Sequence, residues 1–222
     1  MAKNTKPKGT LMERIKATSV IKDAKPLDES NLYSGQAMCS TAVTALNIAL
    51  SGKIDGGLGS GALTIAGPSR HFKSLMGLIL AGAYLQKHKD AVMLFYDSEF
   101  GTPEKYFDAC GIDRNRVMHI PVKNIEELKF DIVKQMEGFQ RGDHVFTFLD
   151  SIGNIASKKE VDDALNDKSV ADMTRAKAIK SLYRMITPYL TINDVPFVAI
   201  AHTYEEMGLF PKQIVSGGKG IM

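Results

Sequence analysis

A glycine-led loop at residues 67–74 carries residue types that can bind a nucleotide phosphate. The segment GPSRHFKS matches the phosphate-loop pattern GxxxxGK[ST] at Gly67, Lys73 and Ser74, with Phe72 in place of the second glycine. In such a loop, backbone N–H groups surround the phosphates, the lysine reaches the β- and γ-phosphates, and the hydroxyl binds Mg²⁺. A glycine turn with a chance Lys-Ser tail is the alternative interpretation. The predicted nucleotide-binding residues of the loop are Gly67, Pro68, Ser69, Arg70, His71, Phe72, Lys73 and Ser74, with ATP and Mg²⁺ as ligands.

Carboxylates follow two further apolar runs. Asp150 ends the run VFTFLD, where a carboxylate can order Mg²⁺ or its water shell, although an Asp at this place can also cap the next turn. Asp97 and Glu99 end the run AVMLFY, and a carboxylate on a strand beside the phosphate loop can orient the attacking water. Glu99 is the candidate for this catalytic role and Asp97 is expected to hold a loop N–H, but the residues alone do not decide between them.

Short apolar strands alternate with helical patterns from residue 40 onward. Strands are predicted at 62–66, 91–96, 117–122, 144–149 and 196–201, and helices at 74–86, 103–110, 125–139 and 169–190. Strands separated by helices predict an α/β fold with a mostly parallel sheet and helices on both faces. Ligands bind such sheets at the carboxyl ends of the strands, which is where the phosphate loop and both acidic positions fall.

The first part of the chain differs in charge from the rest. Residues 1–26 carry seven Lys or Arg side chains against two acidic ones, while the whole chain has a formal net charge of +3. We therefore divide the chain into a basic arm and linker at 1–39, with one short helix at 11–17, and a core domain at 40–222. The arm could contact phosphates, an acidic partner or a neighbouring subunit, and a solvated terminus fits as well.

Composition excludes several classes of protein. The chain is 44% hydrophobic and 24% charged, which is ordinary for a soluble globular protein. Its two cysteines, Cys39 and Cys110, form no CxxC pair, which argues against a disulfide framework or a zinc site. The start lacks a signal-peptide pattern, and no apolar run is long enough to span a bilayer. We expect a cytoplasmic protein with no membrane partner.

Runs of sequence that cover nearly all of residues 40–222 resemble the UvsX-like strand-exchange recombinases of phages, which are RecA-type ATPases. The runs are NIALSGKIDGGLGSGALTIAGPSRHFKS at 47–74, LFYDSEFG at 94–101, LDSIGNIASKKEVDDALND at 149–167, DMTRAKAIKSLYRMITPY at 172–189 and AHTYEE at 201–206. A phosphate loop with Phe at the glycine position resembles this phage branch in particular. The resemblance implies a RecA-like ATPase core.

The resemblance also implies residue roles. Asp150 would complete the Mg²⁺ site with Ser74, and Glu99 would activate water. Tyr106 would stack on adenine, and His202 would sense the γ-phosphate where RecA has glutamine. DNA would be contacted by two loops, near 157–168 and 203–220, and by the helix between them. The implied DNA-binding residues are Lys158, Lys159, Lys177, Lys180, Arg184, Phe210, Lys212, Gly217 and Gly218.

The helix at 169–190 can also be interpreted without the resemblance. Ile179, Leu182, Tyr183, Ile186 and Leu190 share one face, and Lys177, Lys180 and Arg184 share another. A basic stripe opposite a core face suits a DNA backbone, although a solvated surface is the alternative.

The expected function is that of an ATP-dependent recombinase that binds single-stranded DNA. It would form homo-oligomeric filaments and promote homologous pairing and strand exchange in phage recombination, repair and replication, with single-strand-binding and mediator proteins as further partners, in the host cytoplasm. UvsX-like proteins continue past residue 222, so we expect a truncated chain that is a poor ATPase alone and that leaves strand 196–201 or another strand uncovered. A non-catalytic nucleotide-binding or filament-capping module and a RecA-superfamily helicase remain alternatives.

Overall fold

The computed structural model describes residues 9–22, 24–30, 32, 38–166, 174–206 and 212–216. The chain divides into two compact units, Met1–Gln36 and Ala37–Met222. The first unit contains helix α1 (Leu11–Thr18) and the 3-10 helix η1 (Leu27–Glu29), and neither has a buried residue. A capping box starts α1, because the Thr10 hydroxyl accepts from the Glu13 N–H while the Glu13 carboxylate accepts from the Thr10 N–H.

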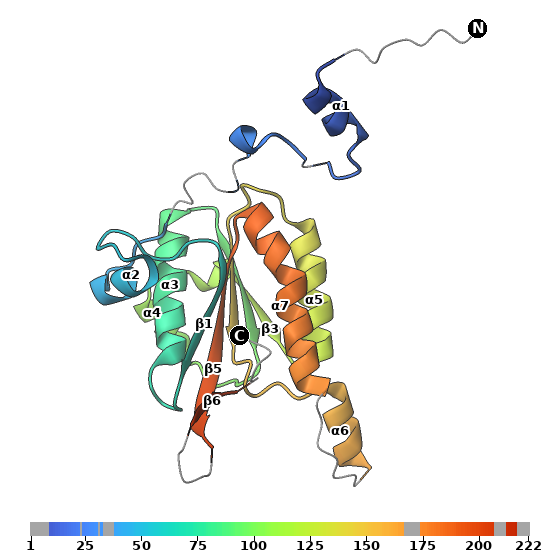
Figure 1. The fold of residues 1–222 in the computed structure, drawn as a ribbon. Helices are drawn as coiled ribbons and strands as arrows, with labels where there is room; N and C mark the ends of the chain where they lie inside the picture. The colour runs from blue at the N-terminus through green and yellow to red at the C-terminus, as the bar shows by residue number, and fades with distance from the viewer. Residues whose placement is uncertain are drawn as a thin grey trace, which may run out of the picture. The chain divides into compact units, whose positions relative to one another are not determined.

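The second unit is built on a six-stranded sheet (Figure 1). Five parallel strands lie in the order β1-β5-β4-β2-β3, and β6 pairs antiparallel with β5. This confirms the predicted α/β fold with a mostly parallel sheet. The strands are β1 Gly61–Gly67, β2 Val92–Asp97, β3 Val117–Pro121, β4 Val145–Asp150, β5 Pro196–Glu205 and β6 Gln213–Val215.

Helices cover both faces of the sheet (Figure 1). They are α2 Thr44–Ser51, α3 Lys73–Lys87, α4 Glu104–Ala109, the 3-10 helix η2 Arg114–Arg116, α5 Ile125–Gly138, α6 Lys158–Leu165 and α7 Thr174–Asn193. Alternate strand residues belong to two separate cores, as the pleat requires. Phe146 and Phe148 of β4 pack in the cluster that holds α3 and α4, whereas Leu149 packs with α5 and α7.

Strand β5 is not the uncovered strand that the sequence suggested. It lies between β1 and β4, and each of its residues from Pro196 to Ala201 is buried. Strand partners on both sides and a core on each face of the sheet account for that burial, and the edges of the parallel sheet are β1 and β3.

The two regions predicted as DNA-contacting loops contain regular structure. The first includes helix α6, and the second includes the end of β5 and strand β6. His202 accordingly lies within β5 and not after it. Phe210, Gly217 and Gly218 fall outside the described residues, as does the start of the helix predicted from residue 169.

Helix α3 is held tightly against the sheet. A Cβ at Gly77 would lie 2.3 Å from the Phe148 ring, so the close approach of α3 to β4 requires glycine there. At the other end of the helix, the Arg116 guanidinium donates to the carbonyl oxygens of Leu85 at 3.0 Å, His88 at 2.6 Å and Ala91 at 2.8 Å. These contacts fix the helix whose first residue is Lys73.

Candidate functional site

The segment between β1 and α3 is a loop that is closed by side-chain contacts with its own backbone carbonyls. Lys73 begins α3, and its side-chain ammonium donates to the Pro68 carbonyl at 2.7 Å. The His71 ring nitrogen Nδ1 lies 2.8 Å from the Ser69 carbonyl, which closes the turn around Arg70. Lys73 is only 6% exposed. The loop thus presents a buried ammonium at a helix N-terminus, where phosphates bind readily.

Phe72 takes the glycine position by adopting the backbone conformation of glycine. Its φ is 54°, and Arg70 in the same loop has a φ of 63°. Left-handed backbone costs a residue with a side chain roughly 1–2 kcal/mol. Phe72 is 67% exposed, so burial of its side chain does not offset this cost. Strain of this kind gathers at functional sites.

A cavity of about 470 Å³ opens beside the loop. That volume lies within the ordinary range for small-molecule sites. It gathers the loop and three more of the predicted residues, Glu99, Tyr106 and His202, from separate elements. The lining residues are Ser69, Arg70, His71, Phe72, Lys73, Ser74, Leu75, Glu99, Gly101, Thr102, Tyr106 and His202. Three of the predicted residues do not line the cavity. Gly67 and Pro68 precede the lining residues in the chain, and Asp150 is hydrogen-bonded to one of them, Thr102.

Glu99 stands at the centre of a chain of hydrogen bonds. Its Oε1 accepts from the Ser151 hydroxyl at 2.7 Å and from His202 Nε2 at 2.5 Å. His202 Nδ1 lies 3.3 Å from the Lys73 ammonium. An ammonium only donates, so Nδ1 accepts and Nε2 carries the proton. Burial raises the pKa of Glu99, but the hydrogen bonds from His202 and Ser151 outweigh it, and the pKa falls below its usual value. Glu99 is therefore ionised at neutral pH.

Asp150 has one satisfied and one unsatisfied oxygen. The Thr102 hydroxyl donates to Oδ2 at 3.1 Å, and the Ser74 hydroxyl also hydrogen-bonds the carboxylate. Oδ1 is buried and has no hydrogen-bond partner among the described residues. Burial, followed by the nearby charges of Glu99 and Asp97, raises the pKa of Asp150. A buried anionic oxygen without a donor, beside a serine hydroxyl, has the chemistry that a divalent cation would satisfy.

These residues fit a magnesium ion better than a metal held by the protein alone. Within the described part of the chain, no group of three or more His, Cys, Asp or Glu side chains could hold a metal. Mg²⁺ is usually bound through one or two carboxylates together with substrate phosphates and water. Asp150 and Ser74 are suited to that arrangement.

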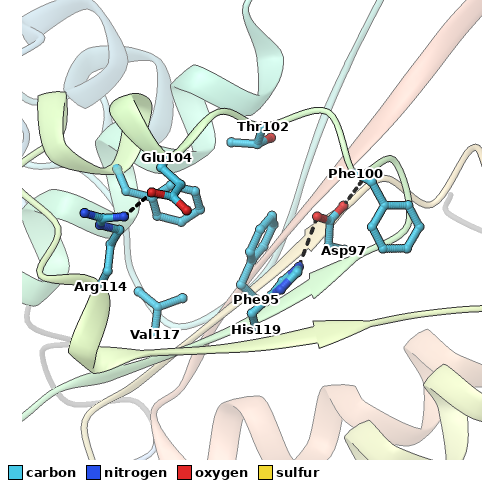
Figure 2. A pocket seen from close by; sticks show the side chains of 9 residues that line it. Phe95, Asp97, Phe100, Thr102, Glu104, Arg114, Val117 and His119 are labelled. Carbon is cyan, nitrogen blue, oxygen red and sulfur yellow. Dashed lines mark hydrogen bonds and ion pairs between the residues drawn. The ribbon is translucent and has the colours of Figure 1, made fainter.

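Asp97 organises the loop that carries Glu99. Its Oδ1 accepts from the backbone N–H of Glu99 at 3.1 Å and from that of Phe100 at 2.8 Å, as expected for a loop-holding residue. Figure 2 shows the contact with Phe100. The Oδ2 of Asp97 lies 3.2 Å from Nε2 of His119, whose ring stacks on Phe95. Asp97, His119 and Phe95 line a second cavity of about 330 Å³, whose lining also includes the Glu104–Arg114 ion pair. Both carboxylate oxygens of Asp97 thus contact groups of the protein that hold the loop and the ring of His119 in place.

The predicted DNA-contacting lysines and arginine lie apart from the cavity. Lys177, Lys180 and Arg184 are exposed on α7, and none of the three bonds to another described residue. Their helix buries Ile179, Leu182, Ile186 and Leu190 on the opposite side. Lys158 and Lys159 begin α6, where Lys159 pairs with Asp163 at 3.5 Å, and Lys212 is exposed just before β6. The α7 residues form the one continuous basic stripe of this set.

Sequence reasoning missed Ser151, whose hydroxyl donates to Glu99, and Thr102, whose hydroxyl donates to Asp150. Ser151 directly follows the acidic strand end, and a serine in that place is a recognisable signal. Thr102 has no such signal, because only the folded loop brings its hydroxyl to Asp150.

The sequence is similar to that of a phage protein. No protein-family model matches the sequence. The chain is 46% identical over 212 residues to a "Recombination and repair protein" of Enterobacteria phage T4. The alignment covers 96% of this chain and 54% of the phage protein, so the chain spans about half the length of that relative. Among the described helices, none is long and apolar enough to cross a membrane.

Proposed function

We propose that this chain binds Mg²⁺·ATP and single-stranded DNA and acts in phage DNA recombination and repair as a RecA-type, UvsX-like recombinase with DNA-dependent ATPase chemistry. The observation that carries the proposal is the convergence of a buried Lys73 at a helix N-terminus with ionised Glu99 in one cavity, beside the unpaired Asp150 oxygen. The similarity to a phage recombination and repair protein supports the biological role.

Each residue of the site has a distinct task in this proposal. Lys73 and the backbone N–H groups of the loop bind the phosphates of ATP, and Tyr106 contacts the base from α4. Ser74 and Asp150 hold Mg²⁺, which neutralises phosphate charge when it is bound. Glu99 orients the attacking water, because it is ionised and its loop is fixed by Asp97. His202 connects Glu99 to Lys73, so phosphate that engages Lys73 changes the surroundings of the catalytic carboxylate.

The basic stripe on α7 supplies the contact with DNA. Its three exposed cations face solvent without a described acidic partner, and an array of that kind binds phosphate backbones without regard to sequence. Copies of the chain would assemble along the strand as a filament.

The experiment is a salt titration of binding to a labelled single-stranded oligonucleotide, followed by fluorescence anisotropy with Mg²⁺ and a non-hydrolysable ATP analogue. The variant replaces Lys177, Lys180 and Arg184 with Ala. The matched control replaces the exposed Lys89, Lys123 and Lys134, which remove the same charge from outside α7.

Each lost phosphate contact flattens the log–log salt slope by about 0.7 for a single strand, so the α7 variant loses about two units. The control keeps the slope of the wild type. Equal slopes for the two variants, or wild-type protein that does not bind the oligonucleotide, would contradict the DNA-binding part of the proposal.

A further inference from the structure

We infer that the guanidinium of Arg70 contacts the terminal phosphate of a bound nucleoside triphosphate and so favours ATP over ADP. The inference rests on the proposed function, because it concerns the same cavity. It goes further by giving a task to a side chain that the phosphate-loop motif uses only through its backbone.

Arg70 is held at the tip of the phosphate loop. The Lys73–Pro68 hydrogen bond at 2.7 Å encloses it, and the His71–Ser69 contact at 2.8 Å spans it directly. Its φ of 63° is a conformation that favours glycine, yet the position carries a long cationic side chain. Arg70 lines the same cavity as Lys73 and Glu99. The loop therefore fixes the backbone of a residue whose side chain borders the proposed nucleotide site.

The Arg70 guanidinium has no partner among the described residues, unlike the other groups around it. The Lys73 ammonium and the His71 ring bond to loop carbonyls. Glu99 accepts from Ser151 and His202, and the Asp150 carboxylate is bonded by Thr102 and Ser74. Two cations, Arg70 and Lys73, thus share one cavity, and of the two only Lys73 bonds to another described residue. Their mutual repulsion would be relieved by a polyanion.

The chemistry of the guanidinium favours a phosphate as its ligand, and the charges already present on the loop favour the terminal phosphate of ATP. Arg presents two parallel N–H donors that match two phosphate oxygens. Lys73 and the N-terminus of α3 provide positive charge for the phosphates that ATP and ADP share, and the lysine of such a loop also reaches the terminal phosphate of ATP. The terminal phosphate of ATP adds negative charge that ADP lacks, and Arg70 is the remaining unpaired cation on the loop. Its contribution therefore falls mainly on the triphosphate.

Two substitutions on this loop separate charge from backbone strain. Arg70→Gly removes the cation and also relieves the left-handed backbone, so the loop does not lose stability. Phe72→Gly makes the same backbone change without removing a charge. Arg70→Lys keeps the charge and loses the planar fork. Calorimetric titration of each protein with Mg²⁺ and the ATP analogue AMP-PNP, and separately with ADP, gives the ratio of the two affinities.

We expect Arg70→Gly to weaken AMP-PNP binding about tenfold, a loss of roughly 1.4 kcal/mol, while its ADP affinity stays within about twofold of the wild type. The AMP-PNP affinity of Arg70→Lys should lie between those of Arg70→Gly and the wild type. Phe72→Gly keeps the wild-type ratio, whatever happens to each affinity. An unchanged ratio in Arg70→Gly, or an equal loss for both nucleotides, would overturn the inference. So would an equal change of ratio in Phe72→Gly, since the backbone would then be the cause.

Failure of this inference can be told from failure of the proposed function. If Lys73→Ala weakens binding of both nucleotides and Arg70→Gly leaves the ratio unchanged, only the role of Arg70 is wrong. If the wild type binds neither nucleotide, the nucleotide site itself is wrong and the inference fails with it. A loss of oligonucleotide affinity in Arg70→Gly at an unchanged nucleotide ratio would assign Arg70 to DNA, and that result also overturns the inference.

Discussion

Replacing Asp150 with Asn is predicted to stabilise the ligand-free protein while it damages the metal site. Asp150 is 1% exposed, and its Oδ1 has no hydrogen-bond partner among the described residues. An unsatisfied buried polar atom costs about 1–3 kcal/mol, and more when it is charged. The amide also leaves one polar atom unpaired, but it removes a negative charge close to Glu99 and Asp97. We expect a net gain of about 1 kcal/mol at pH 7, which raises Tm by roughly 2–4 °C for a chain of this size.

The pH dependence of this difference has a definite sign. The raised pKa means that folded Asp150 binds more proton than unfolded Asp150 at pH values between the usual carboxyl pKa of 3.8 and the higher folded value. Wild-type stability therefore falls as pH rises through that window, and Asp150→Asn lacks this fall. The stability advantage of Asp150→Asn over the wild type is therefore largest at pH values above this window, and it disappears as the pH drops towards 3.8.

The assay is urea denaturation of both proteins between pH 4 and pH 8, with and without Mg²⁺ and AMP-PNP. Ligand at 100 times its Kd stabilises a protein by about 2.7 kcal/mol, and we expect the variant to gain much less than that from the magnesium complex. If ligand-free Asp150→Asn is less stable than the wild type at pH 7, or gains the full stabilisation with Mg²⁺, the reasoning about the unpaired oxygen is wrong.

Two further changes test the catalytic carboxylate and the anchoring of α3. Glu99→Gln keeps an oxygen that can accept from Ser151 and His202, so AMP-PNP affinity should stay within about twofold. DNA-stimulated phosphate release should fall by roughly 10²–10⁴-fold, because the amide cannot act as the base that orients water. Normal phosphate release in this variant would assign the orientation of water to another residue. Arg116→Ala removes three hydrogen bonds to carbonyl oxygens at the end of α3 and should lower the free energy of unfolding in urea by about 2–4 kcal/mol. Arg116→Lys should recover part of this stability, because one ammonium cannot reach all three oxygens. A decrease of less than about 0.5 kcal/mol in Arg116→Ala would refute this anchoring.

The sequence predicted the parts of the fold that depend on local pattern. Alternating apolar strands and helices placed β1 to β5 and helices α3, α4 and α5 within a few residues, and the predicted end of α7 lies three residues before its observed end. The longest of these elements bury a continuous apolar face, which is the pattern that sequence shows best. Helix α6 could have been predicted as well, since Ser157 and Glu160 form a capping box that is visible in the sequence. Helix α2 begins at Thr44 after Val43, which makes no side-chain cap, and β6 is three residues long, so neither gives a strong local signal.

The candidate site was predicted as a set of residues and not as a network. Motif position led to Lys73, Glu99 and Asp150, and the structure brings the first two into one cavity. The Lys73–His202–Glu99 connection depends on the parallel register that places Gly67 of β1 beside His202 of β5, and sequence does not give register between strands 135 residues apart. The contact of His119 with Asp97 likewise follows from the pairing of β2 with β3.

The central claim is that the loop at residues 67–74 binds ATP through Lys73. The most direct test is calorimetric titration of the wild type, Lys73→Ala and the exposed-lysine control Lys134→Ala with Mg²⁺ and AMP-PNP. A charge-assisted contact is worth about 1.5–3 kcal/mol, so Lys73→Ala should weaken binding by roughly 10- to 150-fold. Lys134→Ala should bind as the wild type does. Equal affinity in Lys73→Ala and the wild type would contradict the account, because the buried ammonium of the loop would then have no part in nucleotide binding.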